Sequence, residues 1–171
     1  MDEIREARSL RNIQKLGVVI ETLPLETSQK EFYQRRLRTQ IEEKLSCAGI
    51  EVLPELDAID NRLPYLHVNI NVLKTDVGLY VFATRVCLKQ LMVLPQEPYQ
   101  DFYTSTWELG GVGTVGLKNS SAMLGSICQH VDQFCQDYQA ENLKLNGDCP
   151  SSARQTKTWI RQLTNSFSPF S

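Results

Sequence analysis

A run of alternating polar residues between positions 65 and 74 holds the first side chains that could do chemistry. Tyr65, His67, Asn69 and Asn71 alternate with large aliphatic residues, the pattern of a half-buried β-strand. The four polar groups therefore share one face of a sheet. An imidazole among hydrogen-bonding groups could bind a small polar ligand or a group that carries a proton. Plain solvation of a polar sheet face is the simpler interpretation.

A second strand, from 79 to 94, extends this polar face. The intervening segment, Lys74–Gly78, supplies turn residues, and we predict a hairpin in which Leu73 pairs with Leu79. A shift of one residue would bury Arg85 and Lys89. The parity of the pairing, meaning which side chains face the core and which face outward, is therefore well specified. No carboxylate is expected next to the histidine in this pairing. The candidate binding face consists of Tyr65, His67, Asn69, Asn71, Arg85 and Lys89.

A glycine-rich stretch from 110 to 116 is the second candidate site. It follows a predicted strand at 102–109, precedes a predicted helix at 120–140, and contains the pattern G-x-G-x-x-G. No parallel strand follows the helix, and Asp132 and Asp137 fall inside it, so a dinucleotide site is disfavoured. An anion could bind at the helix N-terminus, although tight turns at a strand end would also explain the glycines. The candidate anion loop consists of Gly111, Gly113, Gly116 and Ser120.

The remaining reactive residue types form no recognisable motif. Cys128 and His130 lie two positions apart on a predicted helix and should not face each other. Trp107 is interpreted as a core residue, with a binding patch as the alternative. The five cysteines include no C-x-x-C pair, which favours free thiols. We therefore expect no catalytic residue, no metal and no cofactor.

Composition excludes two classes of partner. The 171 residues carry 18 basic and 20 acidic side chains, a formal charge of −2. This balance argues against nucleic-acid binding, which requires a clustered basic surface. No apolar run approaches the roughly 18 residues of a membrane span, so no transmembrane segment is expected. The charged N-terminus has no signal-peptide pattern, which predicts a cytoplasmic protein as the sequence stands, or an exported one if a leader is missing.

The elements that must position these residues follow the order β-α-β-β-β-α. A strand is predicted at 16–23 and a helix at 28–48, which ends at Gly49. After a connection with a short strand at 50–53 come the strands and the second helix described above. This order predicts an α+β two-layer sandwich, with a mainly antiparallel sheet and both helices on one face. The polar face of the sheet would then have no cover from within the chain.

Domain boundaries follow from composition. Residues 1–15 are predicted to be a polar lead-in and residues 16–140 a single α+β domain. Residues 141–171 form a polar tail, predicted to be partly disordered, with one short amphipathic helix at 152–163.

Four segments resemble a family of small, uncharacterised bacterial proteins, many of which are made with an export signal. They are Leu16–Glu21, Cys47–Ile50, Pro64–Val72, and Thr106-Trp107 followed by Gly113–Gly116, and the resemblance covers about residues 10 to 140. These motifs shape the fold and imply no activity. The chain departs from the family pattern because it shows no leader.

Two functions are compatible with these features. The first is a non-enzymatic binding or assembly domain whose polar sheet face, or an exposed edge strand, meets a protein partner or a second copy. The alternative is a small-ligand or anion-binding protein, or an enzyme, that uses the segment Gly110–Gly116 with His67 and Arg85.

Overall fold

The computed structural model describes residues 7–21, 30–96, 98–116 and 121–146, and is built around one five-stranded sheet. The strands are β1 (Lys15–Ile20), β2 (Glu51–Leu53), β3 (Tyr65–Lys74), β4 (Leu79–Leu94) and β5 (Gln100–Gly116). Their order across the sheet is β2-β1-β3-β4-β5. The long strands β3, β4 and β5 are antiparallel, whereas β1 lies parallel to both β2 and β3.

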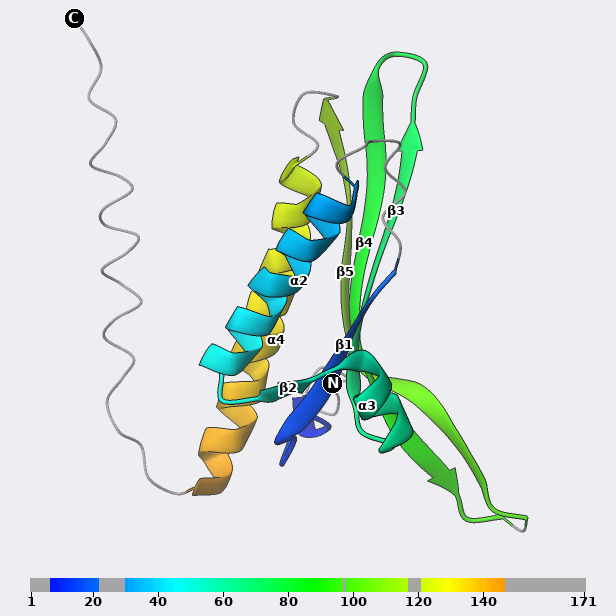
Figure 1. The fold of residues 1–171 in the computed structure, drawn as a ribbon, viewed down its shortest axis with the longest axis vertical. Helices are drawn as coiled ribbons and strands as arrows, with labels where there is room; N and C mark the ends of the chain where they lie inside the picture. Colours follow the sequence, from blue (N-terminus) through cyan, green and yellow to red (C-terminus); the bar gives the residue numbers. More distant parts are fainter. Residues whose placement is uncertain (1–6, 22–29, 97, 117–120, 147–171) are drawn as a thin grey trace, which may run out of the picture.

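The two long helices cover the same face of this sheet. They are α2 (Lys30–Cys47), which packs on β1 and β2, and α4 (Ser121–Asn146), which packs on β4 and β5 (Figure 1). The end of α2 follows the prediction: Gly49 has a φ of 90°, and the amide of Ile50 donates to the carbonyl of Leu45. The α+β class and the placement of both predicted helices on one face are confirmed. The other side of the sheet is called the second face below.

The hairpin between β3 and β4 keeps the predicted parity but not the predicted pairing. Leu73 lies opposite Val81, two positions further along than Leu79. A shift of two residues leaves every side chain on its predicted face, because the side-chain period of a strand is also two. The turn is closed by Gly78, whose φ of 77° suits glycine, and by the amide of Thr75, which donates to the carbonyl of Leu79.

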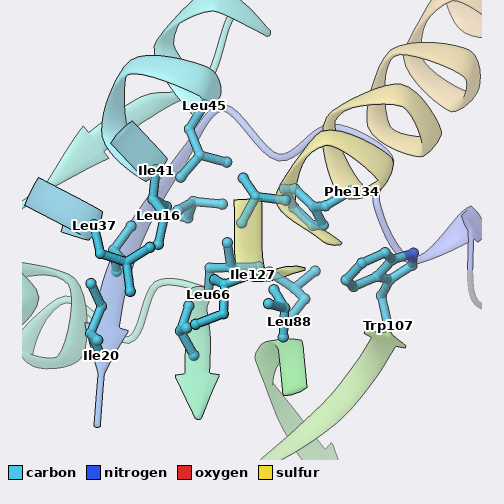
Figure 2. Packing of buried hydrophobic residues seen from close by; sticks show 14 of the residues in the cluster. Leu16, Ile20, Leu37, Ile41, Leu45, Leu66, Leu88, Trp107, Ile127 and Phe134 are labelled. Atoms are coloured by element: carbon cyan, nitrogen blue, oxygen red, sulfur yellow. The ribbon is translucent and has the colours of Figure 1, made fainter. Parts of the chain in front are cut away.

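The core lies between the helices and the first face of the sheet. Leu37, Ile41 and Leu45 on α2 recur at helical spacing and point at the strands (Figure 2). Trp107 is buried, as predicted: its ring meets that of Phe134 at 5.1 Å, and its Nε1 donates to Asp137 at 3.0 Å. The other fully enclosed side chains include Leu16, Val18, Leu66, Val68, Val86, Leu88, Met123, Ile127 and Val131.

The segment before β1 belongs to this core, which the predicted polar lead-in did not foresee. Leu10 and Ile13 are both buried in the main hydrophobic cluster. Asn142 and Tyr138 on α4 donate hydrogen bonds to the carbonyls of Leu10 and Ile13, at 3.0 and 2.8 Å. These contacts fix the N-terminal segment between the helix and the sheet.

A short helix that was not predicted, α3 (Glu55–Asp60), lies on the second face against β1 and β3 (Figure 1). Its Ala58 is fully buried over Gly17, where a β-carbon would come within 2.6 Å of the Ala58 methyl group. The expectation that the chain leaves the second face entirely uncovered is therefore wrong. The expectation was wrong because the segment 51–64 was interpreted as a connection without a helix.

The C-terminal helix α4 runs to Asn146 instead of ending at residue 140. Near its end Glu141 is buried and pairs with Arg11 at 2.9 Å, which ties the helix to the N-terminal segment. The helix predicted at 152–163 lies outside the described residues. Among the described residues, no helix has both the length and the apolarity needed to span a membrane.

Candidate functional site

Most of the predicted polar residues do gather on the second face, in rows that run across three strands. His67, Asn69 and Asn71 on β3 lie opposite Cys87, Arg85 and Ala83 on β4, and the next positions along each row belong to β5. Glu21, directly after β1, joins them, because its amide donates to the carbonyl of Val68 and prolongs the parallel pairing by one residue.

His67 has a carboxylate next to it, contrary to the prediction. Its Nε2 lies 3.0 Å from Oε1 of Glu21. The prediction considered only the β3–β4 hairpin. It did not include the parallel strand β1, where Val19 lies opposite His67, and Glu21, two residues on, reaches the imidazole with its side chain. The one available signal was Glu21, an acidic residue inside the strand predicted at 16–23.

The side-chain amides of Asn69 and Asn71 form a chain of hydrogen bonds that starts at the Glu21 carboxylate. Nδ2 of Asn69 donates to the second carboxylate oxygen of Glu21, and Nδ2 of Asn71 donates to Oδ1 of Asn69 at 2.7 Å. The Glu21 carboxylate thus orients the imidazole of His67 and the amide of Asn69 by direct contact. It orients the amide of Asn71 through Asn69. We call Glu21, His67, Asn69 and Asn71 the polar array.

Arg85 forms a second polar centre beside the array. Its Nη2 donates to Oε2 of Glu108 on β5 at 2.5 Å, and this hydrogen bond raises the pKa of the guanidinium. More than half of the arginine side chain is exposed, so the pair sits in water and is available to an incoming group. It brings both signs of charge to the same part of the second face.

The other end of the candidate face is covered. Tyr65 packs against the ring of Tyr103, with centroids 5.1 Å apart, and burial raises the pKa of its phenol. Tyr103 in turn donates to the carbonyl of Leu63, in the segment after α3. Lys89 lies opposite Tyr65 and is half-buried. These two predicted binding residues therefore sit in or beside packed structure and are separated from the exposed array.

Cys87, His67 and Glu21 lie in the order of a nucleophilic triad, but the structure does not present the thiol for attack. The Sγ of Cys87 is 3.9 Å from Nδ1 of His67, and the cysteine is only 2% exposed. Nucleophilic catalysis needs an accessible thiolate and donors for the developing oxyanion. Cys87 and His67 are paired residues of the central strands of the sheet, so the backbone around them is hydrogen-bonded to neighbouring strands. The arrangement suits positioning of the imidazole better than catalysis.

An apolar patch adjoins the polar array, and sequence reasoning did not identify it. Leu73, Val81, Ala83 and Val112 occupy neighbouring positions of β3, β4 and β5 on the second face. Leu73 is 67% exposed and Val112 is 80% exposed. The sequence did contain a signal for this patch, because the predicted alternation of side chains already placed Leu73 on the same face as Asn71. We call these four residues the apolar patch.

The predicted anion loop is not a loop, because Gly111, Gly113 and Gly116 lie within β5. Gly113 lies opposite Phe82, whose ring occupies the space over it, so that a β-carbon there would come within 2.6 Å of the ring. A β-carbon at Gly111 would lie 3.5 Å from the imidazole of His130. The glycines thus make room for two rings on the helix-covered face. Ser120 lies outside the described residues.

Several hollows of the described structure lie away from the polar array, and two of them are large enough to consider. A cleft of about 830 Å³ runs between α2 and α4, where Lys44 and Asp132 pair at 2.5 Å. Burial raises the pKa of the Cys135 thiol in this cleft to about 11, which keeps it protonated. A cleft of about 350 Å³ lies beside Arg62 and Asp101 at the far end of the β4–β5 hairpin. Among the described residues, no cluster of three histidine, cysteine or acidic side chains is placed to hold a metal ion.

Comparison with known proteins adds little to this geometry. No protein-family model matches the sequence, and no curated protein sequence matches it. Among solved structures, the chain is similar to a minor lipoprotein from Acinetobacter baumannii, with 13% identity and a TM-score of 0.31 over 75% of this chain and 90% of that one. It is also similar to rare lipoprotein B from Shewanella oneidensis, with 12% identity and a TM-score of 0.30 over 87% and 98% of the two chains. These values are too low to assign a function, and the resemblance to exported bacterial proteins stays a prediction.

Proposed function

We propose that the protein is a non-enzymatic binding domain that presents the second face of its sheet to a protein partner. The observation that carries this proposal is the polar array, in which Glu21 orients His67 and Asn69 by direct contact on an exposed part of the sheet. Side chains that are already oriented lose less conformational freedom when a partner binds. A rigid sheet beneath them holds the whole set in one geometry.

The composition of the surface favours a protein partner. Exposed aliphatic side chains at Leu73 and Val112 lie next to amides and the Arg85–Glu108 pair. Protein interfaces combine an apolar centre with a polar, partly hydrated rim, and arginine is enriched in their energetic centres. The pairing rows spread these groups across three strands, an extent that suits a macromolecular surface.

Cross-linking at one exposed position tests the proposal. A photoreactive amino acid replaces Asn71, in the array, or Gln129, which is exposed on α4 and serves as the control. In cells that naturally make the protein, we expect a discrete adduct with one other protein from position 71 and none from position 129. Equal labelling from both positions, or no adduct from position 71, would contradict the proposal.

The ligand-binding alternative is separated by a thermal-shift panel of nucleotides, phosphates and small carboxylates. A protein-binding face predicts no shift with any of them. A reproducible shift that disappears in both His67→Ala and Arg85→Ala would favour a small ligand at the same face.

A further inference from the structure

The outer edge of β5 is long and lacks a neighbouring strand among the described residues. The sheet ends at β5, which runs from Gln100 to Gly116, whereas the opposite edge strand, β2, spans only Glu51–Leu53. An edge strand exposes a row of unpaired backbone amides and carbonyls, and long edges invite pairing with another chain. The β5 edge is therefore the larger of the two open edges.

One part of this edge carries none of the usual protection against pairing. Natural edge strands are guarded by charged side chains, prolines or bulges. The first half of β5 has such features, with Asp101, Glu108 and an irregularity opposite Leu88 and Lys89. From Leu109 to Gly116 the sequence contains no charge and no proline, and the pairing with β4 is regular. In the part of the chain that the structure describes, this second half of β5 is therefore the part of the strand that is open to strand addition.

This half of the strand is nearly the same in both directions around Val112. The sequence is Leu-Gly-Gly-Val-Gly-Thr-Val from 109 to 115. Around Val112 two glycines mirror each other at 111 and 113, and two aliphatic residues do so at 109 and 115, whereas Gly110 mirrors the larger, polar Thr114. In an antiparallel pair related by a two-fold axis, each residue lies opposite its mirror position. Such symmetry is what a strand needs to pair with a copy of itself.

We propose that the stretch Leu109–Val115 pairs antiparallel with the same stretch of a second copy, with the two-fold axis at Val112. Leu109 then lies opposite Val115 of the other copy, on the helix-covered face, where both side chains already pack against the core. Gly111 lies opposite Gly113, and no charged residue faces another. The two sheets become one, with all long helices on the same side.

Val112 is the side chain that changes most on pairing. It points from the second face and is 80% exposed in the single chain. At the axis it meets its own copy as a directly opposed cross-strand pair, an arrangement that favours β-branched side chains. The two second faces then lie side by side in one surface. The inference concerns the edge and does not depend on a partner for the polar array.

Two valines with the same exposure allow a matched test. Val112→Lys would place two like charges opposite each other at the axis. Val77→Lys adds the same charge at the turn between β3 and β4, where the valine is also 80% exposed. We would measure mass against concentration by sedimentation equilibrium with the purified full chain, whose single-copy mass is 19.5 kDa.

We expect the wild-type chain and Val77→Lys to approach twice the single-copy mass as concentration rises, and Val112→Lys to dimerise at least tenfold more weakly. A single-copy mass for the wild-type chain at all concentrations would overturn the proposal, and so would equal behaviour of the two lysine variants. If Val112→Lys fails to fold, Val112→Cys decides the matter. Oxidation by a disulfide such as oxidised glutathione should link two copies through position 112, identified by peptide mass spectrometry, and absence of that link would overturn the proposal.

Discussion

Gly113 and Gly116 differ in what surrounds them, although both lie in β5. The ring of Phe82 fills the space over Gly113, whereas nothing lies within 4 Å of a β-carbon placed at Gly116. Glycine in a strand usually costs stability, and an aromatic side chain across the strand pair recovers part of the loss by covering the backbone. Gly113 is therefore a packing residue of the sheet.

Replacing these two glycines by alanine should have opposite effects on stability. Gly113→Ala forces a methyl group against the Phe82 ring, and we expect a loss of about 1–3 kcal/mol in the free energy of unfolding. Gly116→Ala should be neutral or stabilising by up to about 1 kcal/mol, because alanine restricts the unfolded chain. Urea unfolding followed by circular dichroism measures both free energies. Equal losses in the two variants would show that the packing of the Phe82 ring does not require a glycine at position 113.

His130 should make stability depend on pH. Its Nδ1 is buried without a hydrogen-bond partner among the described residues, and burial lowers the pKa of the imidazole from its ordinary value of 6.5. The folded state thus favours the neutral ring, so this contribution is complete above the unfolded-state pKa and is lost as the pH falls below it.

We therefore expect the wild-type protein to lose more stability between pH 7.5 and pH 5 than His130→Gln, whose side chain does not titrate. The difference between the two pH profiles of unfolding free energy isolates this imidazole from the carboxylates, which both proteins share. Parallel profiles would mean that His130 becomes protonated as readily in the folded state as in the unfolded one.

At the scale of elements, α3 depends on a glycine in the neighbouring strand. Gly17→Ala would bring a methyl group within 2.6 Å of the buried Ala58 methyl, so one of the two must move. We expect a loss of about 1–3 kcal/mol in the free energy of unfolding. Because α3 is short, we also expect faster hydrogen–deuterium exchange at the amides of Ala58 and Leu63, which are hydrogen-bonded in the wild-type structure. Unchanged exchange at these amides would show that α3 does not depend on a glycine at position 17.

The elements that sequence reasoning predicted well are those with strong periodic patterns. The apolar stripes of α2 and α4 and the alternation in β3 are local properties that side-chain periodicity reveals directly. The parity of the β3–β4 pairing was also predictable, because Arg85 and Lys89 could not both be buried. Local pattern thus accounted for the core-facing side of the molecule.

What the sequence could not predict depends on contacts between distant segments. Helix α3 is only six residues long, and its large apolar residues, Leu56 and Ile59, are exposed, whereas the small Ala58 makes the buried contact. Leu10 is buried because α4 and the sheet close around it, which its polar neighbours did not suggest. Glu21 reaches His67 through a parallel strand pairing, and such a neighbour cannot be read from either segment alone.

At the scale of the whole molecule, the two faces of the sheet differ in what they contact. The helix-covered face stabilises the fold, and the second face carries the polar array and the apolar patch, partly sheltered by α3 (Figure 1). If the β5 edges pair as proposed, one assembly would present two copies of this surface, and a partner with two matching sites would bind more tightly through multivalency. The second face is thus the proposed binding surface, and the β5 edge is the proposed contact between copies.

The most direct test of this account is the cross-linking yield from position 71 in two arginine variants. Arg85 lies on the second face and Arg35 is exposed on α2, so replacing either by alanine removes the same charge from the surface. We predict that Arg85→Ala lowers the yield of the partner adduct about tenfold, the effect of losing roughly 1.4 kcal/mol of binding free energy. Arg35→Ala should leave the yield unchanged. An adduct that persists in Arg85→Ala, or that falls equally in both variants, would contradict a partner-binding role for the second face.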